Sequence, residues 1–216
     1  MRIFVSGATA TFRKLLPQFR GMLGRLVTPQ NGNSLHNLVR DNVPWACDNA
    51  AFSNPCDDKF RRMVWECWDL LRFNPPEWIS VPDVVGDHLA TRLNFDLWIA
   101  DWEYEFGFIE WPLAFVLQNG CTEADVPWDL IDGVFVGGCT EWKLRGSLDL
   151  VQAARDRGKW VHVGRVCSRR RLQWAVDVGA DSIDSSAFSR FPEARLVQAL
   201  KWLQAIKQQP TLFEVA

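Results

Sequence analysis

Short apolar runs recur along the chain, and each ends in a polar residue or a glycine. The runs are four to eight residues long and contain many β-branched and aromatic residues, a pattern typical of buried strands. Eight such runs are present, at residues 2–7, 25–29, 45–48, 78–83, 113–120, 133–138, 159–165 and 181–186.

Segments with helical spacing of apolar residues lie between these runs, for example 57–73, 140–158 and 168–179. Asp, Thr or Ser stands at several of their starts and Gly at two of their ends, as expected at helix termini. A strand followed by a helix, repeated along the chain, predicts a parallel sheet. Eight repeats predict a closed (β/α)8 TIM barrel, compact beside the usual ~250 residues of that fold. A doubly wound open sheet is the alternative, because sequence specifies strands more readily than their closure.

The composition changes this picture little. The 216 residues are 48% hydrophobic and 23% charged, which is ordinary for a globular protein and fits a single domain over 1–216. No apolar run approaches the ~20 residues that span a bilayer, and the first residues lack the features of a signal peptide. We therefore expect a soluble, cytoplasmic protein.

The six cysteines form no CxxC pair and no Cys/His cluster, so we expect neither a metal nor a cofactor.

The charge argues against a generally basic surface that binds nucleic acid without specificity. The formal net charge is −2, whereas neutralising phosphates requires clustered Lys and Arg. A local cluster is formed by Arg165, Arg169, Arg170 and Arg171, and a weaker one lies in "TFRKLLPQFRGMLGR". We expect the arginine cluster to contact phosphates, with a solvated helix start as the alternative.

The residues at the carboxyl ends of the predicted strands carry the candidate chemistry, because active sites of this barrel gather there. Three carboxylates, a carboxamide and a glycine pair occur there: Asp48, Asp83, Asp184, Gln118, Gly137 and Gly138. A purine-like base offers two adjacent donors and a carbonyl oxygen. A carboxylate on Asp83, the amide of Gln118 and the backbone N–H of Gly138 would match these groups.

Two carboxylates then remain for displacement at an anomeric carbon, one as nucleophile and one as general acid/base. Asp48 and Asp184 are the candidates. An isolated aspartate near a strand end is more often a helix cap or a turn residue, which is the role we expect for Asp87 and Asp181.

In these segments the chain resembles the tRNA-guanine transglycosylase superfamily, and it is most similar to the phage DNA transglycosylases of the DpdA type. The similarity runs in order along nearly the whole chain. The matching segments are "FVSGATATFRKL", "CDNAAF", "SVPD", "FVLQNG", "GVFVGG", and "VHVGRV" followed by "AVDVGADSIDSS".

The resemblance implies a base-exchange enzyme with a covalent intermediate. It makes Asp184 the nucleophile and Asp48 the general acid/base. It assigns base recognition to Asp83, Gln118, Gly137 and Gly138. Phe52, at the aromatic place of "CDNAAF", would sandwich the base, and Trp45 is a further stacking candidate.

Departures from the family pattern bear on the substrate. The zinc site that supports a tRNA-binding insertion is absent, which favours DNA as the polymer and a free 7-deazaguanine, such as 7-cyano-7-deazaguanine (preQ0), as the incoming base. Ala50 and Ala51 replace two glycines, and "SSAFSR" replaces the Pro-Thr-Arg that follows the family's nucleophile. For a phage-encoded enzyme, the compartment would be the host cytoplasm.

Three other functions fit the same residues. One is a transglycosylase acting on RNA, and a second is a nucleoside or glycoside hydrolase, which would release a base without an acceptor. The third is a barrel that only binds modified nucleic acid.

Overall fold

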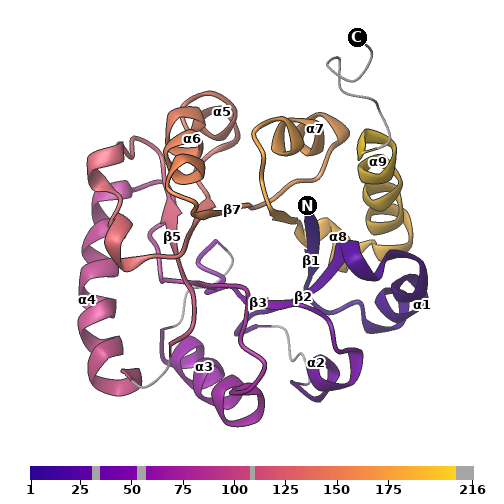
Figure 1. Cartoon of the computed structure of the whole chain (residues 1–216), viewed down its shortest axis with the longest axis horizontal. Helices are drawn as coiled ribbons and strands as arrows, with labels where there is room; N and C mark the ends of the chain where they lie inside the picture. Colours follow the sequence, from indigo (N-terminus) through magenta and orange to yellow (C-terminus); the bar gives the residue numbers. More distant parts are fainter. Residues whose placement is uncertain (31–34, 53–56, 108–109, 208–216) are drawn as a thin grey trace.

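The structure, a computed structural model, describes residues 1–30, 35–52, 57–107 and 110–207 (Figure 1). In this part of the chain, parallel strands pair in sequence order and β8 pairs with β1, so that the barrel is closed. The strands are β1 (Arg2–Val5), β2 (Leu23–Val27), β3 (Trp45–Cys47), β4 (Ile79–Ser80), β5 (Leu113–Leu117), β6 (Gly133–Val136), β7 (Trp160–Val163) and β8 (Ser182–Asp184). The predicted (β/α)8 TIM barrel is confirmed, and the pairing of β8 with β1 rules out the open sheet.

Helices surround the barrel (Figure 1). They are α1 (Thr9–Phe19), α2 (Leu35–Asp41), α3 (Asp57–Leu71), α4 (His88–Phe106), α5 (Thr140–Arg145), α6 (Leu148–Asp156), α7 (Arg169–Asp177), α8 (Ser186–Arg190) and α9 (Val197–Lys207). Short 3-10 or π turns occur at Arg20–Met22, Glu123–Asp125, Trp128–Leu130 and Pro192–Leu196. The single helix expected over 140–158 is two helices. The break follows Arg145, where the N–H groups of Gly146 and Ser147 both donate to the Trp142 carbonyl and end α5.

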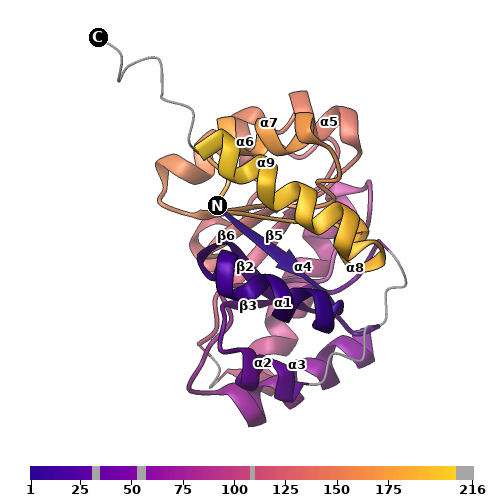
Figure 2. The ribbon, with the colours of Figure 1, turned by 90° about the vertical axis from the view of Figure 1, so that its right-hand side faces the viewer.

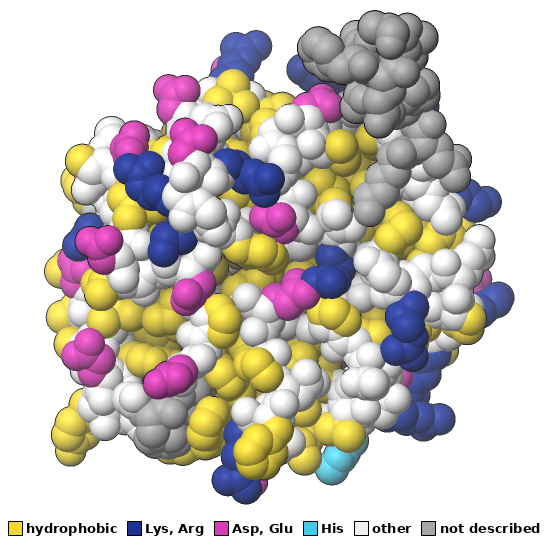
Figure 3. Space-filling model, viewed as in Figure 1, with side chains coloured by type: hydrophobic (Ala, Val, Ile, Leu, Met, Phe, Trp, Pro, Cys, Tyr) yellow, Lys and Arg dark blue, Asp and Glu magenta, His cyan; other side chains and the backbone are white. Residues whose placement is uncertain are grey.

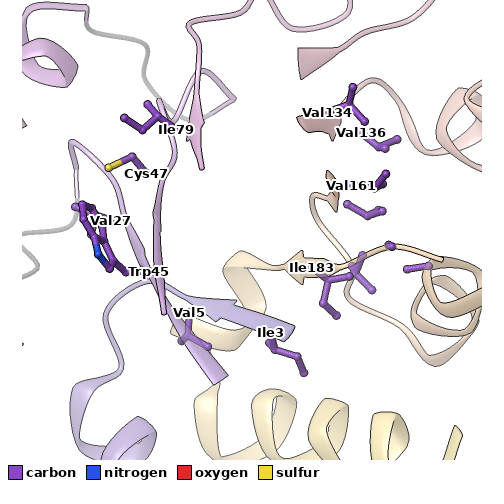
Figure 4. Packing of buried hydrophobic residues seen from close by; sticks show 14 of the residues in the cluster. Ile3, Val5, Val27, Trp45, Cys47, Ile79, Val134, Val136, Val161 and Ile183 are labelled. Atoms are coloured by element: carbon purple, nitrogen blue, oxygen red, sulfur yellow. The ribbon is translucent and has the colours of Figure 1, made fainter. Parts of the chain in front are cut away.

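The strands bury two separate apolar layers. Side chains at alternate positions, such as Ile3, Val5 and Ile183, point out of the barrel toward the helices (Figure 4). The intervening positions, including Phe4 and Leu26, belong to a smaller cluster. This two-residue alternation follows from the pleat of a strand. Each fully buried large apolar side chain contributes about 1.5–3 kcal/mol, so both layers stabilise the closed sheet.

A histidine lies among the aromatic rings of the smaller cluster. The ring of His162 on β7 is 4.6 Å from the Trp78 ring, 4.5 Å from Phe135 and 5.9 Å from Trp160, measured between centroids. Its relative exposure is 0%. Because Phe135 also lines the cavity described below, this aromatic cluster forms part of the cavity floor.

A buried ion pair fixes the first part of the barrel wall. Arg25 on β2 donates from Nη2 to Asp41 Oδ2 at 2.6 Å, and Arg13 on α1 donates from Nε to Asp41 Oδ1, also at 2.6 Å. Arg25 and Asp41 are 3% and 4% exposed. Burial raises the pKa of Asp41, but hydrogen bonds from Arg13 and Arg25 outweigh it, and the pKa is lowered overall.

Figure 1 shows the barrel from the end at which the strands begin. In Figure 2, where the molecule is turned by 90°, β1 runs from left to right, which means that in Figure 1 it runs away from the viewer. On that face, Lys and Arg side chains are interspersed with Asp and Glu (Figure 3).

No helix in the described ranges has the length and apolar character required to cross a bilayer.

Candidate active site

A cavity of about 490 Å³ opens at the carboxyl ends of the strands. Residues predicted at six strand ends and in the following loops line it: Asp48, Phe52, Asp83, Gln118, Gly137, Gly138, Arg165 and Asp184. Residues far apart in the sequence thus share one wall, because each follows a strand of the closed barrel. Arg169, Arg170 and Arg171 do not line this cavity.

Asp184, at the end of β8, is held through one of its two oxygens. Its Oδ1 accepts the backbone N–H of Arg165 at 3.0 Å and lies 3.3 Å from Nε2 of His162. A carboxylate only accepts, so this contact requires the proton of the neutral imidazole to be on Nε2. Nδ1 then accepts the hydroxyl of Ser182 at 2.8 Å. These contacts all involve Oδ1, and among the described residues no group donates a hydrogen bond to Oδ2.

The environment of Asp48 favours a protonated carboxyl group. Burial, and then the nearby charge of Asp184, raise the pKa of Asp48 to about 7, although the backbone N–H of Ala50 opposes the shift. That N–H donates to Asp48 Oδ1 at 3.0 Å. Ala50 adopts φ of +59° to direct it, a conformation for which glycine is favoured. A carboxyl group that titrates near neutral pH can both donate and accept a proton.

Asp83 and Gln118 form a hydrogen-bonded pair on the cavity wall. Gln118 Nε2 donates to Asp83 Oδ2 at 2.6 Å, and Asn49 Nδ2 donates to Asp83 Oδ1 at 2.9 Å. Burial raises the pKa of Asp83, while these two hydrogen bonds act in the opposite direction. Each Asp83 oxygen keeps a second acceptor site for a ligand.

The backbone amides around Gln118 fix its orientation. Its Oε1 accepts the N–H of Gly86 at 2.9 Å and the N–H of Gly138 at 3.0 Å. The Gly138 N–H, expected to meet a ligand carbonyl, is therefore used within the protein. The second N–H of the Gln118 amide remains as the donor at this point of the wall.

The glycine pair makes room for side chains. A Cβ on Gly137 would lie 2.9 Å from Gln118 Nε2, and a Cβ on Gly138 would lie 2.6 Å from the Trp142 ring. Gly138 also has φ of +65°. Gly137 thus leaves room for Gln118, and Gly138 leaves room for Trp142, in addition to the close approach of a flat ligand predicted from the sequence.

Phe52 and Arg165 lie against each other at the rim of the cavity. The Arg165 guanidinium carbon is 4.4 Å from the Phe52 ring centroid, and Phe52 is 65% exposed. Arg165 Nη2 also donates to the Gly138 carbonyl. One ring face of Phe52 is therefore covered by a cation.

Comparison of the sequence with known protein families and with curated proteins gives no match. Function is therefore inferred from the residues of the cavity. In the described ranges, no three His, Cys, Asp or Glu side chains are grouped as metal ligands.

The arginine cluster divides into two parts. Arg169 and Arg170 are exposed in the first turn of α7. Arg171 is half-buried and donates to the Arg165 carbonyl at 3.3 Å and to the Thr140 hydroxyl at 3.1 Å. Arg171 thus ties the loop after β7 to α5, which leaves Arg169 and Arg170 as the exposed cations of the cluster.

Further roles differ from the sequence analysis. Trp45, a stacking candidate, is fully buried on the outer side of β3, where its Nε1 donates to the Asn74 carbonyl at 2.8 Å. That position cannot meet a ligand. Asn49 and His162 were missed as partners of Asp83 and Asp184. The alternation of "WVHV" places His162 on the same strand face as Trp160 and was the available signal.

Two aspartates given structural roles do have them. Asp87 caps α4 by accepting the N–H of Ala90 at 3.0 Å. Asp181, before β8, accepts the N–H of Val161 at 2.9 Å and pairs with Arg155.

The cavity thus combines two carboxyl groups in different settings with a separate carboxylate and amide pair. Asp184 accepts hydrogen bonds through Oδ1, with no donor to its other oxygen among the described residues, and Asp48 has a pKa raised to about 7. Two carboxyl groups with different protonation are the requirement for displacement at an anomeric carbon. The Asp83 and Gln118 pair suits a planar ligand with adjacent donors and a carbonyl group.

Proposed function

We propose that the protein is a DNA-guanine transglycosylase, a pentosyltransferase that replaces guanine in DNA with a 7-deazaguanine such as preQ0. The observation that carries the proposal is the shared cavity, in which Asp48 with its raised pKa and Asp184 lie beside the Asp83 and Gln118 pair. The ordered similarity of the strand-end segments to the tRNA-guanine transglycosylase superfamily supports the same function.

In the first half-reaction, the free oxygen of Asp184 forms a bond to C1′ of the target nucleotide. The bond from C1′ to the guanine nitrogen breaks, and the base leaves with the electron pair. Protonated Asp48 supplies a proton to the leaving base. His162 and the Arg165 N–H hold the nucleophile in position through Oδ1.

In the second half-reaction, a 7-deazaguanine occupies the vacated pocket. Asp48, now ionised, takes the proton from the attacking nitrogen. That nitrogen bonds to C1′, and the bond from C1′ to Asp184 breaks, which restores the free carboxylate. Asp83 accepts the two donors of either base, and the free Gln118 N–H donates to its carbonyl group. Both bases use one pocket in turn, so we expect ping-pong kinetics.

Duplex DNA must present its target nucleotide outside the stack, at a cost of a few kcal/mol. Phe52 at the cavity rim offers an exposed aromatic ring on which a base can stack. Arg169 and Arg170 lie on the helix that follows β7 and are suited to contact phosphates.

The test is base exchange on an oligonucleotide. Wild-type protein is incubated with guanine-containing DNA and 7-cyano-7-deazaguanine, and the digested nucleosides are analysed by mass spectrometry. We expect the modified nucleoside with wild type and with the exposed control Asp129→Asn. Asp184→Ala should give no product and no covalent adduct on a denaturing gel.

Each alternative function predicts a different result. Exchange on RNA of the same sequence but not on DNA would assign the enzyme to RNA. Release of free base without an acceptor would identify a hydrolase. Binding without exchange or release would leave a binding protein, and an adduct that persists in Asp184→Ala would contradict the assigned nucleophile.

A further inference from the structure

A second, smaller cavity lies between α5 and α7, beside the carboxyl end of β7. Its volume is about 60 Å³, and its lining includes Thr140, Lys143, Arg165 and Arg171. No Asp or Glu is among the described residues that line it. Three cationic side chains therefore border a space with room for about two water molecules or one small oxyanion.

Lys143 is the most unusual of these cations, because lysine is rarely buried without a carboxylate partner. It is 4% exposed, and its Nζ donates to the carbonyl of Gly164. Burial, and then the positive charge of Arg165, lower the pKa of Lys143 to about 7. An ammonium group has three donors, and in the described part of the chain Lys143 Nζ has this one neutral acceptor, so most of its hydrogen-bonding capacity is unused there.

The other two cations are also paired with neutral groups at this place. Arg171 donates to the Arg165 carbonyl, the Thr140 hydroxyl and the Cys167 sulfur. Arg165 donates to the Gly138 carbonyl. Carbonyl and hydroxyl oxygens orient these side chains but do not neutralise them. An anion in the cavity would relieve the repulsion among three cations, and the low local dielectric would strengthen the attraction.

We propose that this cavity binds a phosphate group, held by Lys143, Arg165 and Arg171. Resting on the proposed function, we assign the group to a phosphodiester of the nucleic acid strand beside the target nucleotide. Arg165 lines both cavities, so a phosphate here would lie next to the space in which Asp184 meets C1′. The strand would thereby be positioned by a site distinct from the exposed Arg169 and Arg170.

Anion binding should be linked to protonation of Lys143. The charged and titratable groups that influence or face its ammonium group come from four elements and their adjoining loops: Cys139, His162, Arg165, Arg171 and Asp184. A bound anion favours the charged lysine over the neutral form. Since the pKa of Lys143 is about 7, most of this lysine is neutral at pH 8, and binding there should take up about one proton.

Sulfate is a suitable probe because its own charge does not change near neutral pH. Calorimetric titrations at pH 8, at constant ionic strength set with chloride and in two buffers of different ionisation enthalpy, give both affinity and proton uptake. The variants are Lys143→Met and Arg171→Met. Lys159→Met is the matched control, because its Nζ also donates to a backbone carbonyl, that of Ile131, but at the other end of β7.

We expect sulfate affinity to fall about ten- to a hundred-fold in Lys143→Met and in Arg171→Met, as for loss of a hydrogen bond to a charged group. Proton uptake should disappear in Lys143→Met, and Lys159→Met should behave as wild type. No sulfate binding by wild type, or equal binding by wild type and both cavity variants, would overturn the proposal. Circular dichroism identifies a variant that does not fold, and the other cavity variant then decides.

The source of the phosphate is tested by competition. An oligonucleotide that carries the target guanosine should displace sulfate, and a neutral methylphosphonate linkage beside that guanosine should weaken the displacement. If sulfate binding depends on Lys143 but the oligonucleotide does not displace it, the site takes a free anion and the strand assignment is wrong. If base exchange fails while displacement depends on Lys143, the proposed chemistry fails and the phosphate site stands.

Discussion

Replacing Asp48 with asparagine should remove a pH dependence from the stability of the fold. The pKa of Asp48 is raised to about 7 by burial and by the charge of Asp184, against about 3.9 for an aspartate in an unfolded chain. The folded state therefore binds this proton more tightly. Its contribution to stability is fully present below about pH 4 and is lost as pH rises through about 7.

The size of the effect follows from the pKa difference. About three pKa units, at 1.36 kcal/mol each, give at most about 4 kcal/mol between pH 4 and pH 8. Asp48 is only half-buried, in a cavity open to solvent, so water screens part of this. Between pH 5 and pH 8, we expect wild type to lose about 2 kcal/mol relative to Asp48→Asn.

Urea unfolding measures the difference directly. Wild type, Asp48→Asn and the exposed control Asp129→Asn are unfolded at pH 5 and pH 8, and their free energies of unfolding are compared. Contributions from other groups are largely shared and cancel in the comparison. In a protein that keeps Asp48, Asp184→Asn should reduce the pH dependence of the free energy of unfolding, because the charge of Asp184 is the second cause of the raised pKa of Asp48. If wild type and Asp48→Asn lose the same stability between the two pH values, Asp48 does not titrate as described.

The remaining predictions concern the base, the strand and the barrel wall. Asp83→Ala should weaken binding of free 7-deazaguanine by about 1.5–3 kcal/mol for each lost charge-assisted hydrogen bond, as measured by calorimetry; unchanged affinity would remove Asp83 from the pocket assignment. Replacing Arg169 and Arg170 with glutamine should reduce the slope of log DNA affinity against log salt concentration by roughly one unit per lost phosphate contact, as measured by fluorescence anisotropy. Equal slopes for wild type and the double variant would mean that neither arginine contacts DNA. Asp41→Ala leaves Arg25 buried without its carboxylate partner, so urea unfolding at pH 7 should show a loss of about 3–5 kcal/mol, and this difference from wild type should shrink as pH falls through the lowered pKa of Asp41. A loss below about 1 kcal/mol would show that water replaces the carboxylate.

The barrel and much of its site could be predicted from the sequence because the relevant signals are local. Each strand is a short apolar run, and most of the candidate residues lie at the carboxyl end of one. Once closure of the barrel is assumed, Asp48, Asp83 and Asp184 must lie at one end. Closure itself depends on the pairing of β8 with β1, which no local pattern specifies.

Other features depend on which groups meet across the fold. Lys143 lies on a six-residue helix, and its burial results from the packing of α5 against the end of β7. Arg171 belongs to the same run of arginines as Arg169 and Arg170, but its contacts with Thr140 separate it from them. The hydrogen bond from Gly138 to Gln118 likewise joins two strand ends. Spacing along one segment carries no information on such pairs.

Because Arg165 lines both cavities, we expect ligand binding in one to influence ligand binding in the other. Its backbone N–H holds Asp184, and the residue lines both cavities. A ligand that changes the orientation of this guanidinium in one cavity changes the affinity of the other, and the effect is reciprocal by thermodynamic linkage. Whatever factor an anion contributes to base affinity, the base contributes to anion affinity. A single arginine can thus make the affinity for an incoming base depend on whether the second cavity is occupied.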